Sequence, residues 1–196
     1  MRRPSMRVLL FCLPFFFTAG FAGGADPYKL DPVHSTVGFS IKCLGAFRFK
    51  GHFNELTGTI LFDEKAPQNS RVALVVNADS IDTASDTLDA HLKSKTYFNT
   101  KIYPNIVFIS DSVRQAGNDT YEVAGRLTLL SVTKPLTVSA RFKGRGNDSE
   151  VGGLMGFTTS FIINRRDFGM TAGRLIVGDD VTMTISAVGG PASDAP

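Results

Sequence analysis

The sequence predicts a mainly β protein, an antiparallel barrel with one short helix. Three observations support this prediction. Apolar and polar residues alternate with a period of two through most of the chain, helical periodicity appears in only one place, and nowhere do strands and helices alternate as in a parallel sheet. The same strands could also form a sandwich, but a closed barrel removes the exposed edges that many short apolar strands would otherwise present.

The first 25 residues have the pattern of a cleaved secretory signal peptide. Three arginines precede the apolar run VLLFCLPFFF at 8–17, and small residues are frequent from 18 to 25. A membrane anchor is the alternative interpretation, but spanning a bilayer takes about 20 predominantly apolar residues, and Pro14 interrupts this stretch. We therefore expect an exported protein that is not an integral membrane protein after cleavage.

Cleavage is expected after Ala22 or Ala25, where small residues meet the small-x-small rule. The later position leaves one domain at 26–190 and a flexible tail at 191–196, a length that suits a single hydrophobic core. The signal holds three of the 21 basic residues and no acidic one, so 18 basic residues face 18 acidic ones in the mature chain. A formally neutral chain has no basic surplus to attract nucleic acid, which we exclude as a partner.

Nine strands are expected after the signal. In the run FRFKGHF at 47–53, phenylalanines alternate with basic residues and histidine, so one face is aromatic and the other is solvated. The nine candidates span residues 36–43, 47–53, 56–62, 71–77, 106–113, 121–130, 136–143, 156–164 and 181–188. Polar turns at 63–67, 115–119 and 143–148 separate several of them, a spacing typical of hairpins.

One short helix is expected at 85–92. Ser85 can cap its N-terminus, and Leu88 and Leu92 share one face a single turn apart. The segment that follows, 95–104, should cross one end of the barrel.

The common catalytic and metal-binding motifs are absent from the sequence, including the nucleophile elbow, the P-loop and HExxH. His34, His52 and His91 do not have the spacing that places two metal ligands on one strand or helix face. We expect His52 to be solvated and His34 to hydrogen-bond to the backbone. The prediction is a protein with no catalytic residue, no metal and no cofactor.

Cys43 is the only cysteine after the expected cleavage sites, so the mature chain can form no intrachain disulfide. A lone thiol can be a nucleophile or a redox sensor. Here it alternates with Ile41 and Phe39, which predicts an inert cysteine buried in the core.

The apolar side chains suit two different interiors. Eleven phenylalanines follow the signal in a chain without tryptophan, and they could either fill the barrel or line a long cavity. Periodicity leaves both open. By the parity of their strands, the residues expected to face inward are Phe39, Ile41, Phe49, Leu127, Leu129, Phe142, Phe157, Phe161, Ile163 and Met183.

Short blocks of sequence occur in an order characteristic of one family. The blocks are LDPVHS at 30–35, Phe39, GHFN at 51–54, GTI at 58–60, HLKS at 91–94, YFN at 97–99, YP at 103–104, GRLTL at 125–129, VTKP at 132–135 and INRRDFGM at 163–170. In this ordered set, from position 28 to 188, the sequence resembles the YceI-like family of bacterial periplasmic, lipocalin-like polyisoprenoid-binding proteins. It departs from the family pattern at four positions: Tyr28 stands for tryptophan, Cys43 for histidine, Ser131 for glycine and Arg166 for a smaller residue.

The resemblance implies a periplasmic, lipocalin-like barrel that binds, stores or transports a long apolar or amphipathic lipid without catalysis. An isoprenoid, a quinone or a polyprenyl lipid is the implied ligand, and a fatty-acid derivative is an alternative. The implied ligand-binding set consists of the ten inward-facing residues with Cys43, Phe98, Phe108 and Arg165. The sequence does not decide the oligomeric state, and a homodimer is one of the options.

Two other functions stay open at this point. One is a structural or partner-binding barrel with a filled core. The other is an enzyme acting on a small envelope metabolite, whose mark would be two or more titratable side chains converging inside the cavity.

Arg165 has two competing roles at the end of its strand. It can fix the barrel rim by bonding to carbonyls or to an acid such as Asp167, with Gly169 permitting the turn. Alternatively it can stand at the cavity mouth as a donor to a lipid head group.

Overall fold

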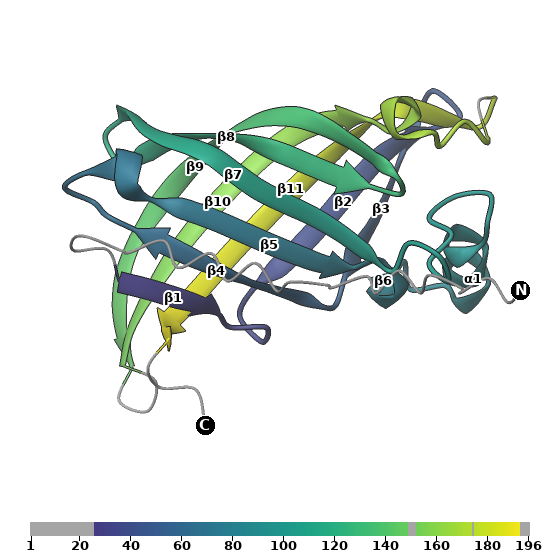
Figure 1. Ribbon diagram of the computed structural model, residues 1–196. Helices are drawn as coiled ribbons and strands as arrows, with labels where there is room; N and C mark the ends of the chain where they lie inside the picture. Colours follow the sequence, from purple (N-terminus) through teal and green to yellow (C-terminus); the bar gives the residue numbers. More distant parts are fainter. Residues whose placement is uncertain (1–25, 149–151, 174, 193–196) are drawn as a thin grey trace, which may run out of the picture.

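Antiparallel strands form most of the structure in the computed structural model, which describes residues 26–148, 152–173 and 175–192 (Figure 1). The expected signal peptide at 1–25 and the end of the expected tail at 193–196 lie outside these described residues. The strands are β1 (Asp26–Leu30), β2 (Thr36–Cys43), β3 (Phe47–Phe53), β4 (Leu56–Phe62), β5 (Arg71–Asn77), β6 (Ile81–Asp82), β7 (Asn105–Gly117), β8 (Thr120–Leu129), β9 (Val132–Asp148), β10 (Gly152–Asn164) and β11 (Val177–Pro191). The helices are α1 (Asp86–Lys93) and the short 3-10 helices η1 (Pro67–Asn69), η2 (Ala78–Ser80) and η3 (Arg165–Phe168).

The strands close into a barrel. The order β1-β4-β5-β7-β8-β9-β10-β11 makes a ring of eight strands, closed by the antiparallel pairing of β1 with β11. The remaining strands extend this ring, because β2 pairs with β11 and β3, and β3 pairs with β6. The pairs β1 and β2, β3 and β4, and β5 and β6 therefore each run as one bent strand along the wall. The predicted antiparallel barrel with one α-helix is confirmed.

A hydrogen-bonded bend joins β1 to β2. The Asp31 carboxylate accepts from the backbone N–H groups of Val33 and His34, and its Oδ2 atom lies 2.6 Å from Nδ1 of His34. The hydrogen bond from the His34 side chain is the main cause that holds the pKa of Asp31 below its usual range. The expectation that the His34 side chain bonds to the backbone was wrong, because the carboxylate three residues earlier is the nearer acceptor.

The two ends of the barrel differ. The turn at 44–46, the segment 83–104 with α1, the turn at 130–131 and the segments 165–173 and 175–176 lie at one end, on the right in Figure 1. The opposite end carries η1 and the turn at 118–119. We call them the α1 end and the η1 end.

Helix α1 begins where the sequence predicted, but its cap differs. Ser85 occupies the N-cap position and makes no side-chain capping hydrogen bond. The Asp89 carboxylate instead accepts from the backbone N–H and the hydroxyl of Thr83, which ties the first turn to the end of β6. Among the described residues, no helix is long and apolar enough to cross a membrane.

Aromatic rings close the η1 end. The Phe62 ring lies 5.1 Å from that of Tyr121, 5.3 Å from that of Phe142 and 5.0 Å from that of Phe157, measured between centroids. We call these four residues the floor cluster. Arg145 covers it from outside, where its Nη1 atom donates to the Tyr28 hydroxyl at 2.5 Å and its guanidinium lies over the Phe142 ring.

Several strands are longer or more numerous than expected. β7, β9 and β11 each extend beyond the predicted runs, since backbone pairing continues where the side chains no longer alternate. β1 and β6 were missed because one contains Pro27 and the other has only two residues. Pro191, expected in the tail, is the last residue of β11.

The floor cluster predicts a large stability difference between two phenylalanines. Phe62→Ala removes a buried ring with three aromatic neighbours, and we expect it to lower the free energy of unfolding by about 3–5 kcal/mol. Phe47→Ala removes a side chain that is 68% exposed and should change stability by no more than about 0.5 kcal/mol. Denaturant titration of both variants tests this, and equal losses would contradict the role of the floor cluster.

Candidate functional site

The barrel encloses a cavity of about 470 Å³. Its wall is built from the inward-facing residues of β2, β3, β4, β5, β7, β8, β9, β10 and β11, because alternate side chains of each strand point to the inside. The lining is overwhelmingly apolar. The size lies within the usual range of small-molecule sites in proteins, about 300–1,000 Å³.

Most residues predicted to bind a ligand lie on this wall. The predicted residues that line the cavity are Phe39, Ile41, Cys43, Phe49, Phe98, Phe108, Leu127, Leu129, Phe157, Phe161, Ile163, Arg165 and Met183. The structure thus brings together residues from eight separate segments of the chain. That they contact a ligand stays a prediction.

Phe142 is the exception and requires a correction. It points inward and is buried, but it packs behind Phe62 and Phe157 in the floor cluster instead of lining the cavity. A register shift in the pairing of β9 with β10 lies beside it, between Gly156 and Phe157. The alternation of side chains along a strand tells which side of the barrel wall a residue faces. It does not tell how far along the barrel axis the residue lies.

Cys43 also differs from its prediction. It is half-buried and lines the cavity where β2 ends, so it is not a fully buried core residue. The strand periodicity assigned the correct face, but the position at the strand terminus leaves the thiol partly exposed.

The segment around α1 supplies wall residues that the predicted set lacked. Leu88, His91, Leu92 and Tyr97 line the cavity, together with the predicted Phe98. The apolar helix face formed by Leu88 and Leu92 could have identified this covering role, because an apolar helix face is expected to pack against an apolar core. The Phe98 ring packs edge-on against that of Phe53, with centroids 5.7 Å apart, which holds the segment over the α1 end.

One glycine lets the wall pack tightly. Gly51 faces inward on β3, and a β-carbon there would lie 2.5 Å from the Phe39 ring. Because glycine has no side chain, the Phe39 ring can lie across this strand and contact both Phe49 and Phe53.

Polar groups on the wall are few and lie mostly near the ends. His91 and Tyr97 stack edge-on at the α1 end with ring centroids 5.1 Å apart. At the η1 end, burial is the largest cause that raises the pKa of Tyr121, followed by the charges of Glu64 and Asp119. Among the described residues, no three histidine, cysteine or acidic side chains are grouped so that they could hold a metal ion.

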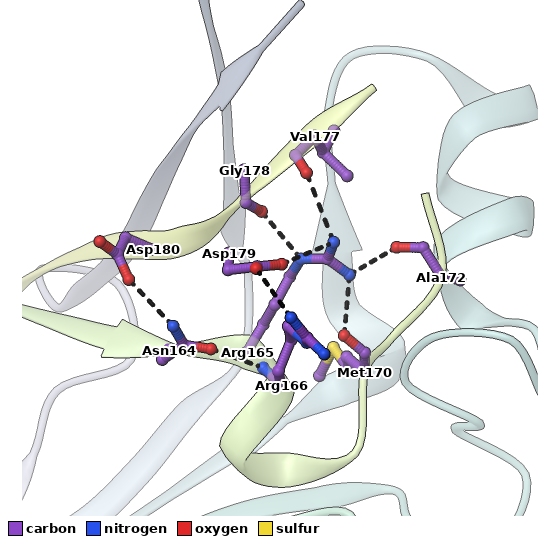
Figure 2. A network of polar contacts seen from close by, with 9 residues as sticks. All are labelled: Asn164, Arg165, Arg166, Met170, Ala172, Val177, Gly178, Asp179 and Asp180. Atoms are coloured by element: carbon purple, nitrogen blue, oxygen red, sulfur yellow. Dashed lines mark hydrogen bonds and ion pairs between the residues drawn. The ribbon is translucent and has the colours of Figure 1, made fainter. Parts of the chain in front are cut away.

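Arg165 is buried in a network of carbonyl groups at the α1 end (Figure 2). Its Nε atom donates to the Gly178 carbonyl at 2.8 Å, and Nη1 donates to the carbonyls of Met170 and Ala172 at 2.8 and 2.6 Å. Nη2 donates to the Val177 carbonyl at 3.4 Å. The side chain is 4% exposed, and its donors all point to protein acceptors.

The acid beside Arg165 is not the one we expected. Oδ1 of Asp179 lies 3.2 Å from Nη2 of Arg165, in ionic contact without the alignment of a hydrogen bond, and Arg166 approaches the other oxygen at 3.5 Å. Asp167 is exposed. Gly169 has a φ of 89°, which glycine adopts readily, and it turns the chain so that the following carbonyls face the guanidinium. This geometry corresponds to the rim-fixing role.

The fold and cavity define a lipocalin-like β-barrel, in which eight antiparallel strands surround an apolar interior. The family model of the YceI-like domain matches residues 28–189. A UPF0312 protein of Yersinia pestis (strain Pestoides F) is 38% identical over 175 residues, which cover 88% of this chain and 90% of that protein. A UPF0312 protein of Yersinia enterocolitica is 37% identical with the same coverage. The chain belongs to the YceI-like family.

Solved structures share the fold. BcnA of Burkholderia cenocepacia superposes with a TM-score of 0.74 at 23% identity, covering 81% of this chain and 98% of that one. A polyisoprenoid binding domain from Saccharophagus degradans superposes with a TM-score of 0.64 at 16% identity, covering 84% of this chain and 98% of that domain. At these identities the likeness concerns the fold alone.

The carbonyl network predicts a structural role for Arg165. Arg165→Met keeps much of the apolar stem, but it leaves several buried carbonyls without a donor and removes the ionic partner of Oδ1 of Asp179. We therefore expect a loss of about 3–5 kcal/mol and a melting temperature lower by about 10 °C. Arg166→Met is the matched control, because this side chain is 39% exposed and contributes a surface ion pair worth at most about 1 kcal/mol. Calorimetry of both variants, with and without bound lipid, tests this; near-normal stability of Arg165→Met would reopen the head-group role.

Proposed function

We propose that this protein binds a long apolar or amphipathic lipid of the polyisoprenoid type in the cavity of the barrel, and stores or transports it without catalysis. The observation that carries the proposal is the cavity itself, a continuous apolar space closed by the floor cluster and reaching the loops of the α1 end. A long chain can lie along such a space with its polar head at the open end.

The energetics favour a long apolar ligand. A chain that buries about 400 Å² of apolar surface gains about 10 kcal/mol relative to water. Association and ordering reduce this value substantially, which leaves micromolar or tighter binding without any ionic contact. That agrees with a wall on which the one arginine, Arg165, has its donors directed to protein acceptors.

The comparisons support the ligand class. A structural neighbour is described as a polyisoprenoid binding domain, and this chain belongs to the same kind of barrel family. The sequence pattern at 1–25 supports export, so we place the function in the periplasm, with 26–190 as the mature domain. A lipid that must cross an aqueous compartment needs an apolar container there.

The two other functions have less support. A filled core does not account for a cavity of about 470 Å³. For an enzyme, the converging titratable groups would be His91 and Tyr97, which meet at the α1 end where His91 is exposed. Their position suits contact with a polar head group better than chemistry in a desolvated interior.

Partly filling the cavity should weaken lipid binding. Ala140 lines the wall on β9, and Ala140→Phe places a ring in the space that the ligand would occupy. We expect at least about a tenfold loss of affinity for a polyprenol, because the displaced apolar contact area is large. Displacement of a fluorescent apolar probe measures it.

The matched control is Ser139→Phe, the neighbouring residue, which is exposed on the outside of the same strand. It should bind like the unmodified protein. Equal affinity of Ala140→Phe and Ser139→Phe, with both folded by circular dichroism, would exclude the cavity as the binding site. Native mass spectrometry of protein purified from its own periplasm would identify the ligand.

His91 should contribute to head-group recognition. His91→Leu keeps an apolar wall and removes a polar partner, so we expect a two- to tenfold loss for a polyprenol and none for the corresponding headless hydrocarbon. His52→Leu is the control, since this side chain is 53% exposed and does not line the cavity. The same loss for both ligands would show that His91 only shapes the wall.

A further inference from the structure

Exposed apolar side chains gather at the α1 end. Among the described residues, eight large apolar side chains are exposed, and four of them lie on or next to two neighbouring loops: Leu44, Leu175, Ile176 and Phe47, the first residue of β3. Leu175 is 97% exposed. Ile102, in the segment that follows α1, is a fifth at this end. We call these five residues the rim patch.

The two loops form one unit. The backbone N–H of Leu44 donates to the carbonyl of Ile176 at 2.7 Å, and Cys43 pairs with Val177 where β2 meets β11. The backbones of both loops are therefore held beside one another at the rim.

Leu44 occupies a position that neither burial nor the turn explains. The turn is closed by the Ala46 N–H, which donates to the Cys43 carbonyl, and its central residues have φ values of 50° for Leu44 and 71° for Gly45. Tight hairpin turns with two positive φ angles favour asparagine, aspartate and glycine. An exposed leucine there suggests a function outside the barrel.

Basic residues surround the rim patch. The segments 42–48 and 91–103 contain no acidic residue, and their basic residues are Lys42, Arg48, Lys93, Lys95 and Lys101. The acidic residues nearby are Asp86, Asp89, Asp167, Asp179 and Asp180. Over residues 42–48, 86–103, 165–167 and 179–180 together, seven basic residues stand against five acidic ones, so this end has a modest net positive charge in a mature chain that we expect to be neutral.

The rim patch also adjoins the cavity. Ile176 is exposed and at the same time lines the cavity, next to Val177 and Cys43. The Tyr97 hydroxyl lies close to Gly173, since a β-carbon added to Gly173 would be 3.0 Å from this hydroxyl. The segment after α1 therefore meets the loop that carries Leu175 and Ile176 across the cavity mouth. A surface that received the rim patch would lie directly over the cavity opening.

We propose that the rim patch docks this protein, mouth first, on the surface of an anionic phospholipid bilayer. Exposed aliphatic and aromatic side chains ringed by lysine and arginine are the combination that partitions into the interface of such membranes. The apolar tips enter the boundary between head groups and acyl chains, and the basic residues contact the anionic head groups. The inference goes beyond lipid binding, and the docking does not require an occupied cavity.

Charge favours a bilayer over a second copy of the chain. Two rim patches facing one another would bring five basic residues of each copy together, which is unfavourable. Side chains that project from loop tips also suit insertion into a soft interface better than packing against a rigid face.

The test is sedimentation of the full mature chain with vesicles of phosphatidylethanolamine and phosphatidylglycerol, compared with vesicles of phosphatidylcholine alone. The unmodified protein should bind the anionic vesicles more tightly, and added salt should weaken that binding. The variant Leu44→Ser/Phe47→Ser/Leu175→Ser should bind at least about tenfold more weakly to both. None of these three residues lines the cavity.

The matched control is Val33→Ser/Ile109→Ser/Ile162→Ser, which removes three exposed apolar side chains from elsewhere on the barrel. It should bind vesicles like the unmodified protein. Lys95→Gln/Lys101→Gln should lose about tenfold on anionic vesicles and keep its binding to phosphatidylcholine.

Three outcomes would overturn the proposal: no vesicle binding by the unmodified protein, equal binding by the two triple variants, or a concentration-dependent dimer that only the rim variant abolishes. The last would assign the rim patch to a second copy of the chain.

The Ala140→Phe variant separates this inference from the proposed function, because it should lose the lipid ligand and keep vesicle binding. If the unmodified protein binds no lipid in its cavity but still docks through the rim patch, the proposed function fails and the docking stands.

Discussion

The alternation of side chains along closed antiparallel strands is the constraint on which the rest of this structure depends. Once β1 pairs with β11, no strand of the ring has a free edge, and every second residue must face a common interior. The backbone polar groups are then satisfied within the wall, so the interior can be apolar throughout. Whether it is filled or hollow depends only on the side chains. At the η1 end four aromatic rings fill it, and along the rest of the barrel the inward side chains leave a cavity.

The α1 end solves a different physical problem, because the strands stop there and backbone carbonyls of the connecting loops turn inward. Arg165 satisfies the carbonyls of Met170, Ala172 and Gly178 with one side chain, in a place where a missing partner would be costly. A charged residue on the cavity wall is therefore compatible with an apolar ligand, since its donors are directed to the protein. The polar contacts left for a ligand at this end come from His91 and Tyr97.

The sequence predicted the fold class and the face of the wall residues because both depend on local period-two alternation, as in β3 and β8. It did not predict depth along the barrel, which depends on register and bulges between distant strands; Phe142 was therefore assigned to the cavity although it lies in the floor cluster. The sequence also did not predict which residues distant along the chain contact one another. Asp179 replaced Asp167 beside Arg165 because the return of the chain at Gly169 brings β11 to the guanidinium.

A hydrophobic cavity and a membrane-facing mouth fit together energetically. The gain of about 10 kcal/mol for burying 400 Å² of a lipid chain is measured against water. The chain of a membrane lipid is shielded from water both in the bilayer and in the cavity. The free-energy difference between these two places is therefore small. Passage through water would then be the barrier, and about 10 kcal/mol corresponds to a factor of about 10⁷ in rate. If the mouth rests on the bilayer, as we propose for the rim patch, the lipid chain can move between two apolar environments without being exposed to water.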